Sequence, residues 1–365
     1  MDEASQVEDR VATLFLIGYR ELPQKPALVI SGDYQQLRQV GHAGDKSVMQ
    51  RFAEARRSFH LQSNYRTRDE ALKAFLKAIR VGQPLKSFLA EFWEGSLISG
   101  SILAAVRWTL LQAETRGYDF TWLTVTHKGV HRVNMAALLC QKEPITREML
   151  ERDGYPGDHA VNAGPIILRP GLRLRLSRNL DKTRGFVNGA LGTILEVLSK
   201  SVAVVALNTG KLVLLHPVSD GKATFLPCAY GYATTVRKAQ GASLDGVVLY
   251  FDHCYPPERG YGYVGASRAR TKGGLYHYGR LRRTDWLPVV EGEGDAEEQV
   301  RRSMESESEA SGSDDDEHDY DGDSDDGYAF EELLGGEEDY EDDSFDASLL
   351  EAAGAGEGAD DAGLF

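Results

Sequence analysis

The sequence predicts an α/β fold in which helices cover parallel sheets and a small β module is inserted. Short apolar runs typical of buried parallel strands, such as those in PALVISGD and GVVLYFD, alternate with amphipathic helical patterns. Between about residues 165 and 230 the pattern changes to short β-type runs separated by glycine or polar turns, after which the α/β pattern returns. A β module that interrupts an α/β domain accounts for both observations.

The elements expected before residue 165 follow from apolar spacing. Residues 6–19 have apolar side chains at helical intervals, and residues 27–30 form a wholly apolar run typical of a buried strand. In the best-marked helix, Thr67 and Glu70 form a capping box, and an apolar stripe leads to a stop at Gly82. The remaining elements expected here are helices at 48–55, 85–93, 101–116 and 128–140 and a strand at 120–126.

The inserted module consists of short β-type runs. LRLRLS alternates strictly between apolar and basic or polar residues, and ALGTILEVL, VAVVAL and KLVLLH follow it with turns between them. This pattern predicts a small antiparallel barrel or meander. After it, we expect a buried strand in GVVLYFD, a helix start in YGYVGASRA and a last strand in GGLYHYG.

The net charge of −15 hides two oppositely charged parts. Residues 291–365 contain 30 of the 56 acidic residues and only two of the 41 basic ones, so residues 1–290 carry a net charge of +13. A basic body is expected of a protein that meets a polyanion such as nucleic acid, although an even spread of this charge would carry no such meaning.

The acidic segment has too little apolar surface to offset its ordering entropy, which predicts a disordered tail over residues 286–365. Two clusters in it, YAFEELL and DSFDASLLEAA, place a Phe before a Leu pair, a pattern that can fold as a helix onto a protein partner. The alternative is a tail that only increases solubility.

Composition also bears on location. The three cysteines form no C-x-x-C pair, so neither a disulfide framework nor a cysteine zinc site is indicated. No apolar run approaches the roughly 18 residues of a membrane span, and the N-terminus has no signal-peptide pattern. We therefore expect no membrane partner and an intracellular location, nuclear or mitochondrial.

Two motifs near the start suggest nucleotide chemistry. Asp2 and Glu3 resemble the acidic pair of P-loop nucleotidases, in which the Asp holds Mg²⁺ through its shell and the Glu orients the attacking water. Such a dipeptide carries weight only through its order relative to later motifs. GDYQQL follows the run at 27–30, which would place Asp33 and Gln36 at the carboxyl edge of a sheet, where an amide can sense a γ-phosphate. The alternative is an ordinary strand-to-loop turn.

Three further motifs supply charged residues. Arg66 of LQSNYR could reach phosphates from the edge of the first domain, although a single arginine is usually a solvated charge. Arg268 of YVGASRAR could act as an arginine finger that stabilises charge developing during transfer. In TTVRKAQGASLD, the residues that could face a ligand are Thr235, Arg237 and Lys238 toward the phosphates of a bound strand and Gln240 and Gly241 toward a nucleotide.

Six motifs in order resemble the Petite Integration Frequency (PIF) family of superfamily 1 DNA helicases, with RecD-type helicases as relatives. They are DEAS, GDYQQL, LQSNYR, LRPGLRLRLSRNLDKTRGFVNGALGTI, TTVRKAQGASLD and YVGASRAR. The resemblance covers about residues 2–280 and implies P-loop NTPase (RecA-like) sheets, the first of them incomplete. The implied domains are the rest of the first RecA-like domain (1–95), the second in two parts (96–165 and 229–285), the inserted small β-barrel (166–228) and the tail (286–365).

The resemblance implies an ATP-dependent DNA helicase, with ATP and Mg²⁺ as cofactors and single-stranded and duplex DNA as partners. The family couples ATP hydrolysis to 5′→3′ movement on single-stranded DNA, which suits DNA repair or recombination. Thr126 and His127 would lie near the DNA path. The implied catalytic residues are Asp2 and Glu3 as the magnesium and water-activating pair, Gln36 as the γ-phosphate sensor, and Arg66 and Arg268 as arginine fingers.

The sequence departs from the family pattern in several places. Arg38 and Gln39 stand where the family has prolines, and Arg237 stands in place of a usual His. The sequence contains no G-x-x-x-x-G-K-[ST] phosphate loop. We therefore expect a fragment, or a chain whose upstream piece is supplied separately, and severely weakened ATP binding. The alternatives are a nucleic-acid-binding remnant without catalysis and an interaction protein in which the acidic tail occupies the basic body or a partner.

Overall fold

The computed structural model describes residues 3–34, 36–37, 46–56, 59, 66–253 and 259–289. The expectations for Asp2 and for the acidic tail beyond residue 289 lie outside these residues. Residues 286–289, which the expected disordered tail included, are folded instead, because Trp286 is only 1% exposed and packs in a hydrophobic core. In the described part of the chain, no helix combines the length and the apolar character needed to cross a membrane.

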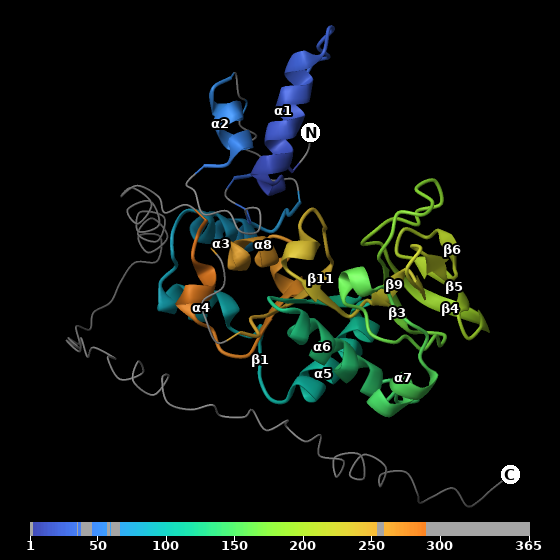
Figure 1. The fold of residues 1–365 in the computed structure, drawn as a ribbon. Helices are drawn as coiled ribbons and strands as arrows, with labels where there is room; N and C mark the ends of the chain where they lie inside the picture. The colour runs from blue at the N-terminus through green and yellow to red at the C-terminus, as the bar shows by residue number, and fades with distance from the viewer. Residues whose placement is uncertain are drawn as a thin grey trace, which may run out of the picture. The chain divides into compact units, whose positions relative to one another are not determined.

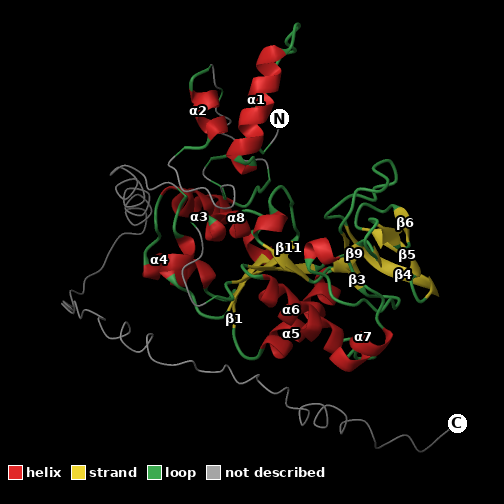
Figure 2. Ribbon diagram, viewed as in Figure 1, coloured by secondary structure: helices red, strands yellow, loops and turns green. Residues whose placement is uncertain are grey.

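A five-stranded parallel sheet with the order β1-β12-β11-β2-β10 forms the centre of the fold (Figures 1 and 2). Every residue of β2 (Phe120–Thr124) is buried, and all but the last residue of β11 (Gly246–Tyr250) are buried as well. The other members are β1 (Leu97–Ile98), β10 (Ala233–Thr235) and β12 (Leu275–Tyr278). Strands buried on both faces require helices on both sides.

Helices cover both faces of this sheet (Figure 1). One core joins it to α5 (Ile102–Arg116) and α6 (His127–Leu139). A second core joins it to α3 (Glu70–Val81), α4 (Lys86–Trp93) and α8 (Tyr261–Ala266). Successive residues of β2 and β11 alternate between the two cores, as the pleat of a strand requires.

Aromatic side chains hold α3 and α4 against the sheet. Phe75 stacks on Phe92 with ring centroids 3.6 Å apart and meets Trp286 edge-on at 5.4 Å. Residues 70–93 therefore pack against the five-stranded parallel sheet, which the sequence analysis assigned to the second RecA-like domain. The sequence analysis had assigned residues 1–95 to the first domain. The helical pattern predicted an apolar face but could not show which sheet that face would meet.

The inserted module is a five-stranded antiparallel sheet with the order β6-β5-β4-β3-β9. Its strands are β3 (Arg173–Leu176), β4 (Leu191–Ser199), β5 (Val202–Leu207), β6 (Leu212–Leu215) and β9 (Cys228–Tyr230). Within residues 166–253, all of which are described, no pairing of β6 with β9 closes the sheet, so the predicted barrel is not confirmed. Because β10 begins three residues after β9 ends, the parallel sheet fixes where β9 leaves the module.

The N-terminal segment forms a small core of its own. The short helix η1 (Ala4–Gln6), α1 (Asp9–Glu21) and α2 (Val48–Glu54) meet at Ala4, Ala12 and Met49, each of which is fully buried. Several apolar side chains of α1 remain exposed, including Leu14 at 62%.

The strand expected at residues 27–30 is not formed. These residues have no strand partner among the described residues, and Val29 is 75% exposed. A buried parallel strand needs hydrogen-bonded neighbours on its sides, and an apolar run cannot provide them by itself. The prediction of a buried strand at residues 27–30 was therefore wrong.

The remaining elements are short. The sequence analysis did not predict α7 (Arg147–Asp153), whose N-cap Thr146 accepts a hydrogen bond from the backbone N–H of Met149. The others are the pair β7 (Val218–Ser219) and β8 (Thr224–Phe225) and the 3₁₀ turns η2 (His159–Val161), η3 (Arg237–Ala239), η4 (Lys272–Gly274) and η5 (Arg283–Trp286).

The start of α3 differs from the expected capping box. Asp69 is the N-cap, and its carboxylate accepts from the backbone N–H of Leu72 at 3.1 Å. The same carboxylate accepts from the backbone N–H of Lys272 at 2.7 Å, which ties α3 to the loop before β12. Thr67 instead donates its hydroxyl to the carbonyl of Arg270. Both Thr and Asp are common N-cap residues. Asp69 is the one used here, in the position where its carboxylate also binds the N–H of Lys272.

Replacing Asp69 tests this assignment. Asp69→Ala should lower the free energy of unfolding by about 1 kcal/mol or more, because it removes the cap of α3 and the bond to Lys272. Asp69→Asn is the matched control, because it keeps an acceptor oxygen and should retain most of the stability. Chemical denaturation measures both variants, and an Asp69→Ala variant as stable as the wild type would contradict the assignment.

Candidate functional site

The parallel sheet brings three chain segments together at its carboxyl edge. Thr124 at the end of β2 pairs with Thr235 at the end of β10 and with Tyr250 at the end of β11. The residues that follow these strand ends are therefore neighbours, although more than 100 positions separate the end of β2 from the ends of β10 and β11. Ligands of open α/β sheets bind at this edge.

Asp252, two residues after β11, holds the start of α6. Its Oδ1 accepts from the backbone N–H of Val125 at 2.8 Å and of Thr126 at 3.1 Å, and its Oδ2 accepts from the Thr126 hydroxyl. Thr126 is the N-cap of α6, and its hydroxyl oxygen accepts from the N–H of Gly129 at 3.0 Å. The predicted DNA-contacting Thr126 is thus fixed in place from both sides.

Gly129 is required by this arrangement. A Cβ at residue 129 would lie 2.0 Å from Oδ2 of Asp252, closer than any real contact allows. Because residue 129 has no side chain, the Asp252 carboxylate can lie against the N-terminus of α6, where the helix dipole favours negative charge.

Lys238 and His127 lie on the surface near this edge. Lys238 in η3 is exposed, and its backbone N–H donates to the hydroxyl of Thr235 at 3.3 Å. Burial lowers the pKa of His127 below 6.5, and the nearby Lys238 ammonium lowers it further. Thr235 itself is only 6% exposed, so it positions Lys238 rather than facing solvent. Thr126, His127, Thr235 and Lys238, predicted together as DNA-binding, are gathered at one edge.

Arg237 takes a different direction from Lys238. Its guanidinium lies over the ring of Tyr261 in α8, 5.9 Å from the ring centroid. Because neighbouring residues in a 3₁₀ turn diverge, Arg237 faces α8 while Lys238 faces the antiparallel module.

A second group of predicted residues gathers where the N-terminal segment meets α8. The backbone N–H of Ala4 donates to the carbonyl of Ser31 at 2.9 Å, and a Cβ on Gly32 would lie 3.0 Å from the Ala4 nitrogen. Glu3 therefore lies beside the GDYQQL motif, as its predicted role requires.

Asp33 links that motif to α3 and α8. Its carboxylate accepts from Nε2 of Gln36 at 3.0 Å and from a guanidinium N–H of Arg80 at 3.0 Å. Arg80 also donates to the hydroxyl of Tyr263 at 3.0 Å. Sequence reasoning missed Arg80 and Tyr263, because neither has a distinguishing local pattern.

The two predicted arginine fingers approach the same region. Arg66 donates to the hydroxyl of Ser243 and to the carbonyl of Ser267, both at 3.1 Å. Arg268 is 1% exposed and donates to the carbonyls of Val264 and Ala242 and to the hydroxyl of Ser267.

The charge of Arg268 depends on its surroundings. Burial, and to a smaller extent the neighbouring Arg66, lower its pKa to about 10, while Tyr263, Glu3 and Asp33 oppose this effect. The predicted Glu3, Arg66 and Arg268 therefore lie within electrostatic reach of one another. In this conformation the Arg268 guanidinium is occupied by protein acceptors, so contact with a nucleotide requires it to exchange them.

Two amide side chains at this site have buried atoms without hydrogen-bond partners. They are Oε1 of Gln36 and both Oε1 and Nε2 of Gln240. Buried polar atoms are nearly always paired, so a ligand bound here could supply the partners that these atoms lack. The next residue, Gly241, has a positive φ of 78° and open space around its Cα.

These residues fit part of a nucleotide site. Guanidinium groups and amides suit phosphate oxygens and a base or ribose. No group of three or more His, Cys, Asp or Glu suited to a metal occurs in the described ranges, and Asp2 lies outside them. The residues present therefore suit the nucleotide, and a magnesium contact would rest on Glu3 and Asp2. The bound nucleotide would supply the phosphoryl group that is transferred to water.

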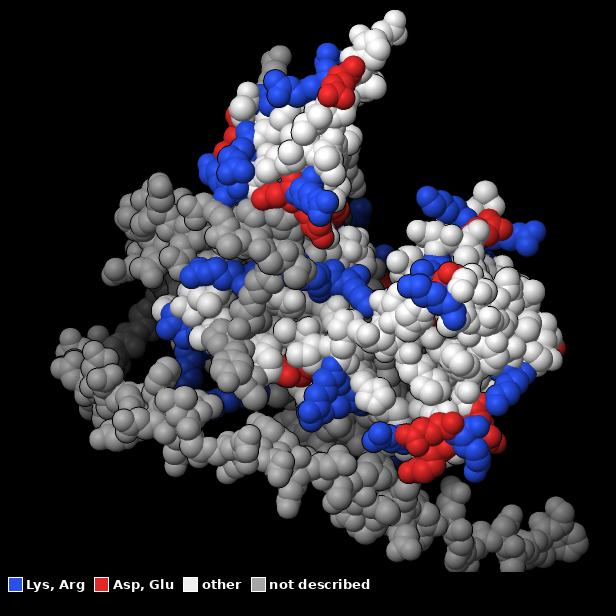
Figure 3. Space-filling view, viewed as in Figure 1, with Lys and Arg blue, Asp and Glu red and all other residues white. Residues whose placement is uncertain are grey.

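Basic side chains are frequent on the face viewed in Figure 3. Lys and Arg are spread widely over it, whereas Asp and Glu form smaller groups. This distribution agrees with the net charge of +13 for residues 1–290.

Known proteins resemble this chain in sequence. Residues 230–276 match the UvrD-like helicase C-terminal domain. The chain is 35% identical over 121 residues to the ATP-dependent DNA helicase PIF1 of Xenopus laevis, in an alignment that covers 30% of this chain and 19% of that protein. It is 24% identical over 320 residues to the ATP-dependent DNA helicase Pif1 of Campylobacter jejuni, which covers 76% of this chain and 68% of that protein.

Solved structures show the same fold. The Pif1 helicase of Candida albicans superposes with a TM-score of 0.58 at 18% identity, covering 83% of this chain and 76% of that one. Bacteroides Pif1 bound to ssDNA superposes with a TM-score of 0.57 at 19% identity, covering 84% and 75%. Together with the sequence matches, these likenesses confirm the resemblance to Pif1-like superfamily 1 helicases and a RecA-like helicase fold.

The collision expected at residue 129 gives a stability test. Gly129→Ala should lower the free energy of unfolding by about 1 to 3 kcal/mol, because the new Cβ displaces the Asp252 carboxylate. In an Asp252→Ala background the same change should cost nothing, because alanine favours helix by about 1 kcal/mol over glycine. A double-mutant cycle measures the coupling, and equal losses in both backgrounds would contradict the contact.

The lowered pKa of His127 predicts a pH effect. Because the folded protein binds this proton less tightly than the unfolded chain, the stability linked to His127 is present above about pH 6.5 and is lost as the pH falls below it. Lys238→Met should raise the pKa of His127 part of the way back, and Lys128→Met, at an exposed neighbour, should not. NMR titration of the imidazole distinguishes the two variants, and an unchanged pKa in Lys238→Met would show that the two side chains do not interact.

Proposed function

We propose that this chain forms the C-terminal part of an ATP-dependent DNA helicase. The observation that carries the proposal is the joining of two sites by one sheet. The carboxyl edge presents Lys238 and His127. Two residues beyond Lys238, Gln240 has buried amide atoms without partners among the described residues. Ala242 and Ser243, shortly after it, accept hydrogen bonds from Arg268 and Arg66 of the second site. A short turn, η3, therefore links a DNA-contacting residue to a nucleotide-facing one.

In this proposal the carboxyl edge binds the phosphates of single-stranded DNA. Lys238 pairs with a phosphate, and the start of α6, which the Asp252 contact holds in place, positions His127 near Lys238. His127 is neutral at pH 7 and donates a hydrogen bond rather than a full charge. By resemblance to the PIF family, the protein moves along the strand in the 5′→3′ direction.

At the second site, Glu3 orients the water that attacks the γ-phosphate, and Gln36 contacts that phosphate. Arg66 and Arg268 stabilise the charge that develops on the transferred group. Gln240 and Gly241 face the nucleotide. The exchange of Arg268 from protein carbonyls to phosphate couples hydrolysis to a movement of α8, since Val264 of α8 supplies one of those carbonyls.

The second candidate function is a nucleic-acid-binding protein without catalysis. The observation that favours it is the absence of a G-x-x-x-x-G-K-[ST] loop from the 365 residues. Such a protein would keep the basic edge and lose nucleotide turnover.

Binding and ATPase measurements on this chain distinguish the two. We expect oligothymidylate to bind with an affinity that falls steeply with salt, and Lys238→Met to reduce the slope of log K against log salt by about 0.7, the value for one phosphate of a single strand. DNA-stimulated ATPase should be close to background.

The decisive experiment fuses a strand and a phosphate loop upstream of Met1 and measures DNA-stimulated ATPase again. Recovery of DNA-stimulated ATPase supports the helicase. Intact salt-dependent DNA binding without any recovery supports the second candidate, and robust ATPase by the chain as it stands would overturn the expected need for a phosphate loop.

A further inference from the structure

Arg282, the residue just before η5, binds the loop that follows β11. One terminal nitrogen of its guanidinium donates to the carbonyl of His253 at 2.8 Å. The other donates to Nδ1 of His253 at 3.3 Å and to the carbonyl of Phe251 at 3.5 Å, since arginine has no acceptor. Phe251 and His253 stand on either side of Asp252 in the chain. One side chain therefore holds both neighbours of the residue that fixes the start of α6.

The turn that carries Arg282 is anchored in the core. Nε of Arg282 lies 3.1 Å from Oδ2 of Asp285, whose side chain is fully buried, and the backbone N–H of Asp285 donates to the carbonyl of Arg282 at 3.1 Å. The next residue, Trp286, is 1% exposed and packs on the ring of Phe251, with centroids 5.8 Å apart. Because η5 is fixed to the core, a bond from Arg282 to the loop restrains the loop.

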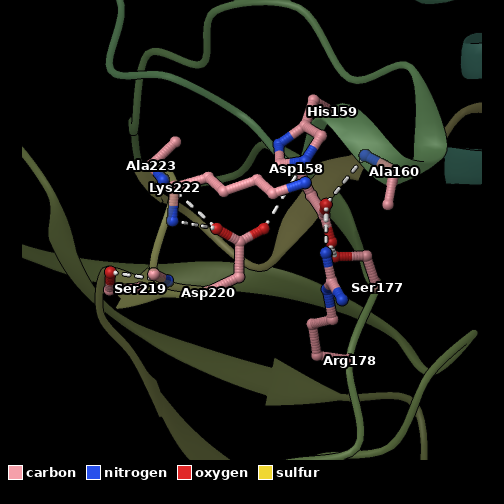
Figure 4. Close-up of polar contacts among 10 residues, drawn as sticks. Asp158, His159, Ala160, Ser177, Arg178, Ser219, Asp220, Lys222 and Ala223 are labelled. Carbon is pink, nitrogen blue, oxygen red and sulfur yellow. Dashed lines mark hydrogen bonds and ion pairs between the residues drawn. The ribbon is translucent and has the colours of Figure 1, made fainter.

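A second buried ion pair shows that Arg282 does more than neutralise its acid. In the antiparallel module, Arg178 gives two guanidinium nitrogens to the fully buried Asp158, at 2.6 and 2.8 Å (Figure 4). Arg282 gives only Nε to Asp285, and Oδ1 of that carboxylate has no hydrogen-bond partner among the described residues. An incompletely bonded buried carboxylate lowers stability. Neutralising the acid therefore does not explain why the other nitrogens of Arg282 bind the loop.

Holding these neighbours determines where the Asp252 carboxylate points. The ring of Phe251 packs in the core that contains α3, α4 and α8. The carboxylate of Asp252 reaches the other way, to the N–H groups of Val125 and Thr126 at 2.8 and 3.1 Å. A rotation of the loop backbone would carry the carboxylate away from α6. Arg282 opposes this rotation, because it bonds the carbonyls before and after Asp252.

We propose that Arg282 is a positioning residue for the DNA-contacting edge and acts through Asp252 on the start of α6. This inference rests on the proposed DNA-binding function and adds the contact that sets the geometry of that site. The route runs from Arg282 through the loop to Asp252, and from its carboxylate to Thr126, the N-cap of α6. Arg282 makes no contact with DNA in this role. Lys238, which comes from η3, keeps its place without it.

Replacing Arg282 tests the inference through two measurements. Arg282→Met should weaken oligothymidylate binding several-fold at low salt and leave the slope of log K against log salt unchanged, because Lys238 keeps its phosphate. Without DNA, the pKa of His127 should rise toward 6.5, because a loosened start of α6 exposes the imidazole to water. NMR titration measures this second effect and does not depend on DNA binding.

Arg282→Lys separates charge from geometry. It keeps a positive charge beside the buried Asp285, so the protein should fold with close to wild-type stability. The affinity for oligothymidylate and the pKa of His127 should still change, because an ammonium does not span two carbonyls as the planar guanidinium does. Wild-type values of both in this variant would overturn the inference.

Arg283→Met is the matched control at the next residue. The guanidinium of Arg283 donates to the carbonyl of Pro84, just before α4, at 2.9 Å. This variant should keep the wild-type affinity and the wild-type pKa of His127. In an Asp252→Ala background, Arg282→Met should cause no further loss of affinity, because the route to α6 is already interrupted.

Three results would contradict the positioning role. A slope reduced by about 0.7 in Arg282→Met would show that Arg282 binds a phosphate itself. Additive losses with Asp252→Ala would show that it does not act through Asp252. A lower melting temperature with unchanged affinity and an unchanged His127 pKa would show a purely structural role. If the wild type binds no oligothymidylate, the proposed function fails, and the pKa of His127 still decides whether Arg282 positions α6.

Discussion

The pairing of β2 between β10 and β11 determines where the polar groups at the carboxyl edge of the sheet lie. Because Thr124 is in register with both Thr235 and Tyr250, the loops after three strands leave the sheet at one level. A shift of one residue in either pairing would turn the following side chains to the opposite face. The burial of β2 on both faces fixes this register, so core packing sets the geometry of the site.

Anionic and cationic side chains at this edge differ in how many protein partners they have. The carboxylate of Asp252 is satisfied by backbone N–H groups and a hydroxyl at the start of α6, where the helix dipole favours it. Among the described residues, the exposed ammonium of Lys238 at the same edge has no ion-pair partner. The edge therefore has a satisfied anion and an exposed cation, which is the balance expected where a polyanion binds.

Local pattern was sufficient for elements whose partners lie close in sequence. The strand 202–207 has the predicted bounds, because a short valine-rich run with turns on both sides defines it. The run 27–30 has an equally apolar pattern but forms no strand, since pairing depends on neighbours that a local pattern cannot supply. Likewise, Thr67 and Asp69 are both good caps, and the contact with Lys272 makes Asp69 the one used.

The same limit applies to the site. Motif order placed Glu3, Arg66 and Arg268 in one region, and the electrostatic coupling among them agrees with that placement. Asp252 and Arg80 were missed, because their importance comes from what they touch across the fold. An acid directly after a buried strand was the available signal for Asp252, and the sequence analysis did not use it.

Hydrogen–deuterium exchange with and without oligothymidylate tests the central claim most directly, since it reports which backbone N–H groups the strand covers. The account predicts slower exchange in peptides that span residues 124–131 and 235–240 when DNA is saturating. It predicts no change in peptides from residues 105–114 of α5, which packs on one face of the sheet and not at its carboxyl edge. Protection restricted to α5, with both strand-end segments unchanged, would contradict it.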